Sequence, residues 1–207
     1  MNKSKNYTIA QVLFGVYCAA LIIQNTLAMK SIDVLGFTVT TGVLVSPLLF
    51  IAQDVSSEVF GYKQTKNMIL LSFAMNLVAV ILYQIAIAIP ASSVWTNQEA
   101  FSSILGTTGR IAFASFMAYV LGSLANSKIM TKMKEKHSDS LFVRAITSTI
   151  VGQLLDNAIF SFVAFAGVIP TVNIVTMVVG ATLFETVYEV VLYPVTRAVI
   201  ARVRDNV

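Results

Sequence analysis

The chain has 207 residues, of which 57% are apolar and 12% are charged. Soluble domains contain roughly 45–50% apolar and about 25% charged residues, so this composition excludes a soluble globular protein. The net charge is +4, and the sequence has one cysteine and one histidine. Those two side chains cannot form an internal disulfide and leave almost nothing for a zinc or copper site. The composition therefore predicts an integral membrane protein without a bound metal.

Six apolar segments are long enough to cross a bilayer, since a spanning helix needs about 20 mostly apolar residues. They cover residues 8–29, 37–60, 67–89, 110–130, 141–168 and 172–201. A short amphipathic segment within residues 91–108 is expected along the outer surface. We find no internal repeat or linker, so the prediction is one all-α membrane domain with six transmembrane helices over residues 1–207.

The basic residues outside these segments lie almost entirely on one side of the membrane if the six helices alternate in direction. Lysines precede the first segment and follow the second and the fourth, and arginines end the sixth. The positive-inside rule then places both termini in the cytoplasm. This topology explains the basic net charge, so direct nucleic-acid binding is not expected.

Polar side chains interrupt the fifth and sixth segments near their centres. Gln153, Asp156 and Asn157 share one helix face because they are three and four residues apart, and Phe160 lies one turn further along. Glu185 occupies the sixth segment. A carboxylate at mid-membrane disfavours insertion by about 2.5–3.5 kcal/mol, so these acids must face the interior of the bundle. There they either pair with polar groups on neighbouring helices or line a solute path.

The second segment leaves two structures open. Pro47 removes a backbone donor and predicts an interruption of the helix. Asp54 and Glu58 follow, one turn apart. If the helix continues through them, both acids are buried on one face. If it ends before them, they are cytoplasmic and pair with Lys63 and Lys66.

Two features of the fourth and fifth segments also have more than one interpretation. Ala114, Ala118 and Gly122 recur every four residues, and such a small-residue stripe would serve internal packing or a homodimer equally well. Arg144 either extends to the inner membrane surface or pairs with an acid inside the bundle. Glu189, nearer the cytoplasmic end of the sixth segment, is either a structural polar contact or part of the solute path.

Three segments are similar to the queuosine precursor transporter family, also called the putative vitamin uptake transporter family. They are DVSSEVFGY (residues 54–62), GRIAFASFMAYVLG (109–122) and RAITSTIVGQLLDNAIFSFVAFAG (144–167). The resemblance implies a six-helix protein of the bacterial inner membrane that imports 7-deazaguanines, such as preQ0, preQ1 or queuine, for tRNA queuosine salvage. It implies no cofactor. The polar motif positions of the family fall on Asp54, Glu58, Arg110, Ser115, Arg144, Ser148, Gln153 and Asp156.

The chemistry of the central residues suits such a ligand. Asp156 can accept the adjacent N–H donors of a 7-deazaguanine, and the Gln153 amide can meet its 6-oxo group. Phe160 can stack on the ring, a contact that contributes about 1–3 kcal/mol in single-strand binders. One departure concerns Glu185, where many members of the family carry a lysine. An acid at this position would favour the aminomethyl cation of preQ1.

The preferred hypothesis is a stand-alone importer whose partners are a nucleobase-like solute and the lipid bilayer. The main alternative is a substrate-binding subunit of an ATP-driven energy-coupling transporter, and expression without such a complex would separate the two. A membrane enzyme that uses Asp54, Glu58 and Asp156 as acid–base groups is disfavoured, because the sequence has no nucleophile or metal motif.

Overall fold

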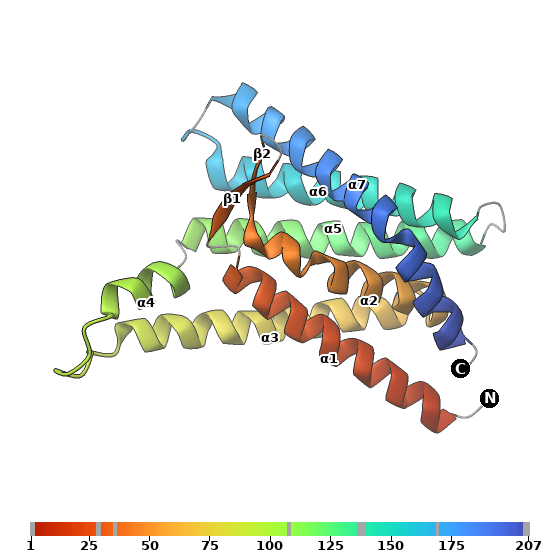
Figure 1. Cartoon of the computed structure of the whole chain (residues 1–207), viewed down its shortest axis with the longest axis horizontal. Coiled ribbons are helices and arrows are strands. Elements are labelled where there is room, and N and C mark those ends of the chain that lie inside the picture. Colours follow the sequence, from red (N-terminus) through yellow and green to blue (C-terminus); the bar gives the residue numbers. More distant parts are fainter. Residues whose placement is uncertain are drawn as a thin grey trace.

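The computed structural model describes residues 3–27, 30–34, 37–106, 109–135, 140–168 and 170–204. Most of these residues are helical. The helices are α1 (Lys3–Leu27), α2 (Ser46–Val59), α3 (Tyr62–Ala88), α4 (Gln98–Leu105), α5 (Gly109–Glu135), α6 (Leu141–Phe165) and α7 (Thr171–Arg204). Helices α3, α5 and α6 run roughly along the long axis, while α1 and α7 cross it obliquely (Figure 1). Both ends of the chain lie at the same end of the molecule (Figure 1).

Four helices in the described part of the chain are long and apolar enough to cross a membrane, by length and composition. They are α1 from Tyr7, α3, α6 and α7. Helix α2 has 14 residues, or about 21 Å, which is shorter than the hydrocarbon core of about 30 Å. The expectation of a helical membrane protein is thus confirmed, and the number of six crossings stays a prediction.

The expected continuous helix over residues 37–60 is wrong in its first half. Strand β2 (Phe37–Thr40) pairs antiparallel with β1 (Ser31–Val34), and the 3-10 turn η1 (Thr41–Leu44) then leads into α2. Pro47 stands in the first turn of α2. It fits there because the first N–H groups of a helix have no partner within the helix, so the missing donor costs little. The proline therefore opens α2.

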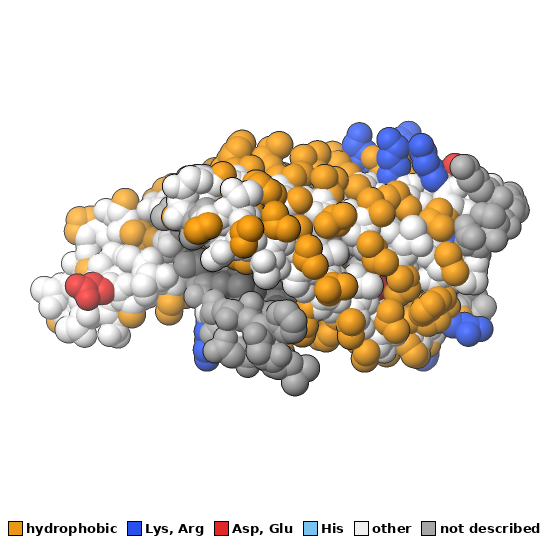
Figure 2. Space-filling view, turned by 90° about the horizontal axis from the view of Figure 1, so that it is seen from above, with side chains coloured by type: hydrophobic (Ala, Val, Ile, Leu, Met, Phe, Trp, Pro, Cys, Tyr) orange, Lys and Arg blue, Asp and Glu red, His pale blue; other side chains and the backbone are white. Residues whose placement is uncertain are grey.

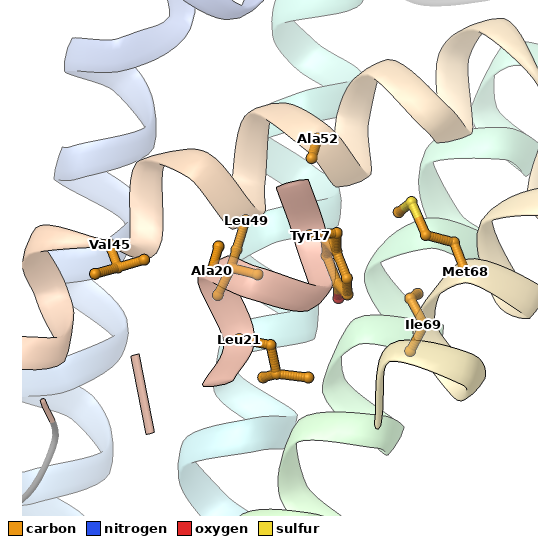
Figure 3. Close-up of a cluster of buried hydrophobic side chains, with 8 residues drawn as sticks. All are labelled: Tyr17, Ala20, Leu21, Val45, Leu49, Ala52, Met68 and Ile69. Atoms are coloured by element: carbon orange, nitrogen blue, oxygen red, sulfur yellow. The ribbon is translucent and has the colours of Figure 1, made fainter. Parts of the chain in front are cut away.

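Helix α2 lies at the centre of the molecule, in contact with α1, α3, α5 and α7. Because other helices surround α2, many of its polar side chains are buried. An apolar cluster joins α2 to α1 and α3, and Figure 3 shows the side chains of these elements pointing toward one another. The cluster consists of Tyr17, Ala20, Leu21, Val45, Leu49, Ala52, Met68 and Ile69.

The small-residue stripe of α5 is buried within the chain. Ala114 and Ala118 are inaccessible to solvent. At Gly122, an added Cβ atom would lie 2.7 Å from the Cβ atom of Asp156 and 2.8 Å from the backbone oxygen of Gly152, so α5 and α6 touch through backbone atoms. The internal-packing interpretation is confirmed, and the stripe offers no free surface for a homodimer.

The outer surface has the polarity expected of a membrane protein. Hydrophobic side chains cover the middle of the face in Figure 2, and lysine and arginine side chains gather toward the end where the termini lie. The opposite end carries α4, in which Phe101 packs edge-on against Trp95 of the preceding turn, with ring centroids 5.5 Å apart. A short helix in the segment 91–108 is thus confirmed, and its place at the membrane surface stays a prediction.

Candidate functional site

A small cavity lies where α1, α2, α5, α6 and α7 meet. Its volume is about 50 Å³. A single water molecule needs about 10–15 Å³ on this measure, whereas ligand pockets are on the order of 300 Å³ or more. The cavity therefore has room only for a few water molecules in this conformation and admits a larger solute only when the surrounding helices move apart.

The cavity wall combines acids, amides and two aromatic rings. Helices α6 and α7 contribute the acids, and α1, α2, α5 and α6 contribute the amides. Aromatic rings come from α2 and α5. These lining residues are Asp156 and Glu185, then Gln24, Gln53, Asn126 and Gln153, and finally Phe50 and Tyr119. Among the described residues that line the cavity there is no lysine, arginine or histidine.

The two acids of the cavity are held in different ways. Asn157 Nδ2 donates a hydrogen bond to Glu185 Oε2 at 2.8 Å and another to Thr182 Oγ1 at 3.3 Å, which joins α6 to α7. Asp156 makes no hydrogen bond or ion pair with any other described residue. It rests on Gly122, whose missing side chain leaves room for it. The alternative in which Asp156 pairs with a polar group on a neighbouring helix is therefore wrong, and Arg144 bonds to Glu58 instead.

A chain of hydrogen bonds fixes the side of the cavity formed by α1, α2 and α5. Tyr119 Oη donates to Tyr17 Oη at 2.8 Å, and Tyr17 Oη donates to Gln53 Oε1 at 3.0 Å. Gln53 Nε2 in turn donates to the backbone oxygen of Ser123 at 3.1 Å. Both polar atoms of the Gln53 amide thus hold one protein partner each, and these bonds fix the amide in the cavity wall.

Two other amides of the cavity wall are not satisfied by protein groups. Gln24 Nε2 donates to Ser46 Oγ at 3.4 Å, but Gln24 Oε1 is buried without a hydrogen-bond partner. Asn126 Oδ1 is likewise buried and unpaired. Buried polar atoms are nearly always hydrogen-bonded in proteins. These two acceptors are therefore available to donors of a solute in the cavity.

Glu58 forms a separate ionic cluster beyond the cavity, at the end of α2. Its carboxylate is buried, and Arg144 Nη2 of α6 donates to Glu58 Oε1 at 2.8 Å. Arg204 of α7 also bonds to Glu58 Oε1, and Lys134 of α5 lies 3.8 Å from it. Helix α2 therefore continues through Glu58, and this acid pairs with basic residues of α5, α6 and α7. The alternative in which α2 ends before the acids, so that they pair with Lys63 and Lys66, is wrong. The alternative in which Arg144 extends to the membrane surface is wrong as well.

Asp54 on α2 and Glu189 on α7 are two further buried acids. Asp54 Oδ2 and both carboxyl oxygens of Glu189 are buried without a hydrogen-bond partner. Neither residue lines the cavity. Among the described residues, no cluster of His, Cys, Asp or Glu is arranged to hold a metal ion.

Residues 40–199 match the sequence profile of the family described as Putative vitamin uptake transporter. The chain belongs to this family. It is 27% identical over 153 residues to the Probable queuosine precursor transporter of Bacillus subtilis (strain 168), over 73% of this chain and 67% of that protein. It is 28% identical over 142 residues to the Queuosine precursor transporter of Escherichia coli (strain K12), over 69% of this chain and 62% of that protein.

A third relative, the Probable queuosine precursor transporter of Haemophilus influenzae (strain ATCC 51907 / DSM 11121 / KW20 / Rd), is 25% identical over 138 residues, or 67% of this chain and 57% of that protein. The matches thus span 57% to 67% of the length of these relatives. No solved structure matches the chain. The family and the apolar helices together make the protein a multi-pass membrane protein.

Two further residues that the family resemblance suggested, Ser148 and Ser115, do not line the cavity. Ser148 is buried, donates to the backbone oxygen of Ala145 at 3.0 Å and contacts Met130. Ser115 is half-buried on α5 and does not line the cavity. The Arg110 side chain lies outside the described part of the structure.

The structure also changes the aromatic residues assigned to the site. Phe160 packs edge-on against Phe165, with centroids 5.9 Å apart, and does not line the cavity. Phe50 and Tyr119 do line it, and the sequence interpretation missed both. A signal for Tyr119 was present, since it precedes Gly122 by three residues and therefore shares a helix face with this glycine.

Proposed function

We propose that the protein is an inner-membrane transporter that imports queuosine precursors, which are 7-deazaguanine bases. The names of its relatives support this function. The observation that carries the proposal is an enclosed cavity rich in hydrogen-bond acceptors, with two acids and two unpaired amide oxygens in its wall. A 7-deazaguanine is a flat solute with several N–H donors, which such a wall can satisfy.

The cavity residues have distinct proposed roles. Asp156 accepts the N–H donors of the N1 and 2-amino edge, and its freedom from protein partners leaves both oxygens available. The Gln153 amide donates to the 6-oxo group. Phe50 or Tyr119 takes the stacking role that sequence reasoning gave to Phe160, because these rings line the cavity. Such stacking contributes about 1–3 kcal/mol in nucleic-acid binders.

The proposed topology has six crossings, with both termini in the cytoplasm. Helix α2 completes one crossing together with η1 and the β1–β2 hairpin, whose paired strands satisfy their own backbone groups. The basic side chains that gather near the termini support this orientation (Figure 2).

The topology can be tested by fusing a reporter that is active only in the periplasm to each end of the chain. Both fusions should be inactive. Activity at either end would overturn this topology.

The proposed unit is a single transporter domain over residues 1–207 that is not an enzyme. The family match over residues 40–199 supports a transporter. A substrate-binding subunit of an ATP-driven complex remains the alternative. Expression in a host that lacks such complexes separates the two, because only a stand-alone importer will restore uptake there.

The decisive test is uptake in a bacterial host that can neither synthesise nor import queuosine precursors. The host expresses this protein, receives an external precursor, and queuosine in its tRNA is measured. The wild type should restore queuosine, and Asp156→Asn should lose at least tenfold in uptake at equal membrane abundance. Glu99→Gln, an equivalent change at an exposed site, serves as control. Full uptake by Asp156→Asn would show that Asp156 does not bind the base.

A further inference from the structure

We infer that the cavity selects a positively charged substrate, a 7-deazaguanine with a protonated aminomethyl group at position 7, over the neutral nitrile analogue. This inference rests on the proposed function and specifies its substrate. It starts from the charges of the cavity wall. Asp156 and Glu185 both line the cavity, and none of the described lining residues is basic.

The basic side chains near the cavity are engaged elsewhere. Arg144, Lys134 and Arg204 all contact Glu58, beyond the cavity, and none of them lines it. The two acids of the cavity therefore have no protein cation to neutralise them. A cation brought in by the substrate is the countercharge that this wall lacks.

Glu185 is placed to receive that cation. Asn157 holds it through Oε2, while Oε1 makes no bond to another described residue. Glu185 and Asp156 line the same small cavity. One ligand can therefore reach both acids, with its base edge on Asp156 and its 7-substituent on Glu185.

The nitrile analogue can make only a weaker second contact. Its 7-substituent is neutral and has no hydrogen to donate, so it can only accept a hydrogen bond from Glu185 when that acid holds a proton. Such a bond between neutral groups contributes less than a charge-assisted hydrogen bond from an ammonium group to a carboxylate. The amine is therefore expected to bind about 10- to 100-fold more tightly than the nitrile.

The test is a binding measurement on the full chain, purified in detergent, by isothermal titration calorimetry. The probes are 7-aminomethyl-7-deazaguanine (preQ1), 7-cyano-7-deazaguanine (preQ0) and guanine. We expect the amine to bind about 10- to 100-fold more tightly than the nitrile in the wild type. Glu185→Gln should remove most of this difference by weakening the amine alone, and Glu99→Gln should leave it unchanged.

The outcomes separate this inference from the proposed function. If none of the probes binds to the folded wild-type protein, the proposed function fails and the inference fails with it. If the nitrile binds as tightly as the amine, the proposed function stands and the inference is wrong, a result that needs no variant. Equal loss of both ligands in Glu185→Gln, with helicity and melting temperature unchanged, would also refute selection by this acid.

Discussion

Removal of the Arg144 guanidinium should destabilise the protein far more than removal of either other cation that contacts Glu58. Arg144 is 13% exposed and Glu58 is 1% exposed, so their ion pair is nearly excluded from solvent. Breaking a buried pair costs about 3–5 kcal/mol when one charge loses its partner. Here two other cations still contact Glu58, so we expect the lower end of this range, about 3 kcal/mol, for Arg144→Ala.

The ion pairs of the other two cations with Glu58 should contribute much less to stability. Lys134 is 41% exposed and Arg204 is 50% exposed. Solvent screens such pairs, which contribute about 0–1 kcal/mol each. We therefore expect Lys134→Ala and Arg204→Ala each to cost less than about 1 kcal/mol, although all three cations contact one acid.

The assay is reversible unfolding of the detergent-solubilised protein by increasing fractions of sodium dodecyl sulfate, followed by far-ultraviolet circular dichroism. Arg197→Ala is the matched control, because Arg197 is exposed on α7 and makes no ion pair with a described residue. Equal losses of stability for Arg144, Lys134 and Arg204 would refute the argument from burial. So would an Arg144→Ala variant as stable as the control.

Two further substitutions test packing and hydrogen bonding by the same unfolding measurement. Gly122→Ala should cost about 1–3 kcal/mol, because its Cβ atom would lie 2.8 Å from a backbone oxygen of α6. Gly15→Ala, with nothing within 4 Å, should be neutral or slightly stabilising, and equal effects at the two glycines would contradict the contact. Tyr17→Phe should cost about 1–3 kcal/mol, because it leaves the buried Gln53 Oε1 without its donor. Tyr7→Phe, at a side chain that is 70% exposed, should stay within about 0.5 kcal/mol of the wild type, and a Tyr17→Phe variant that matches it would show that the bond contributes nothing.

The long helices could be predicted from the sequence because the membrane leaves few alternatives. A run of about 20 apolar residues in hydrocarbon must satisfy its backbone groups internally, and a helix does so. The segments 141–168 and 172–201 accordingly correspond to α6 and α7 within a few residues. The hairpin was missed, because short apolar runs such as Phe37–Thr40 fit a buried helix and a strand equally well.

The candidate site could be predicted where its residues share one helix face or stand out as acids in an apolar segment, as Glu185 does. Gln153 and Asp156 were placed together from their spacing, and both line the cavity. The bond between Glu58 and Arg144 joins residues 86 positions apart, and no local pattern indicates which distant helix will supply a partner. Spacing was not enough at Phe160, which shares the helix face of Asp156 but lies about 6 Å further along α6, where it packs against Phe165 and does not line the cavity.

The glycine contact between α5 and α6 limits the motions by which the protein can open. Helices α5 and α6 are in close backbone contact at Gly122 and Gly152, which leaves no space for one to move relative to the other. The two helices should therefore move as one rigid body. Helices α1, α2 and α3 share their own apolar cluster and form a second body (Figure 3). The hydrogen bond between Tyr17 and Tyr119 crosses the seam between these bodies. Solute entry is therefore expected to follow this seam, with the two tyrosines parting first.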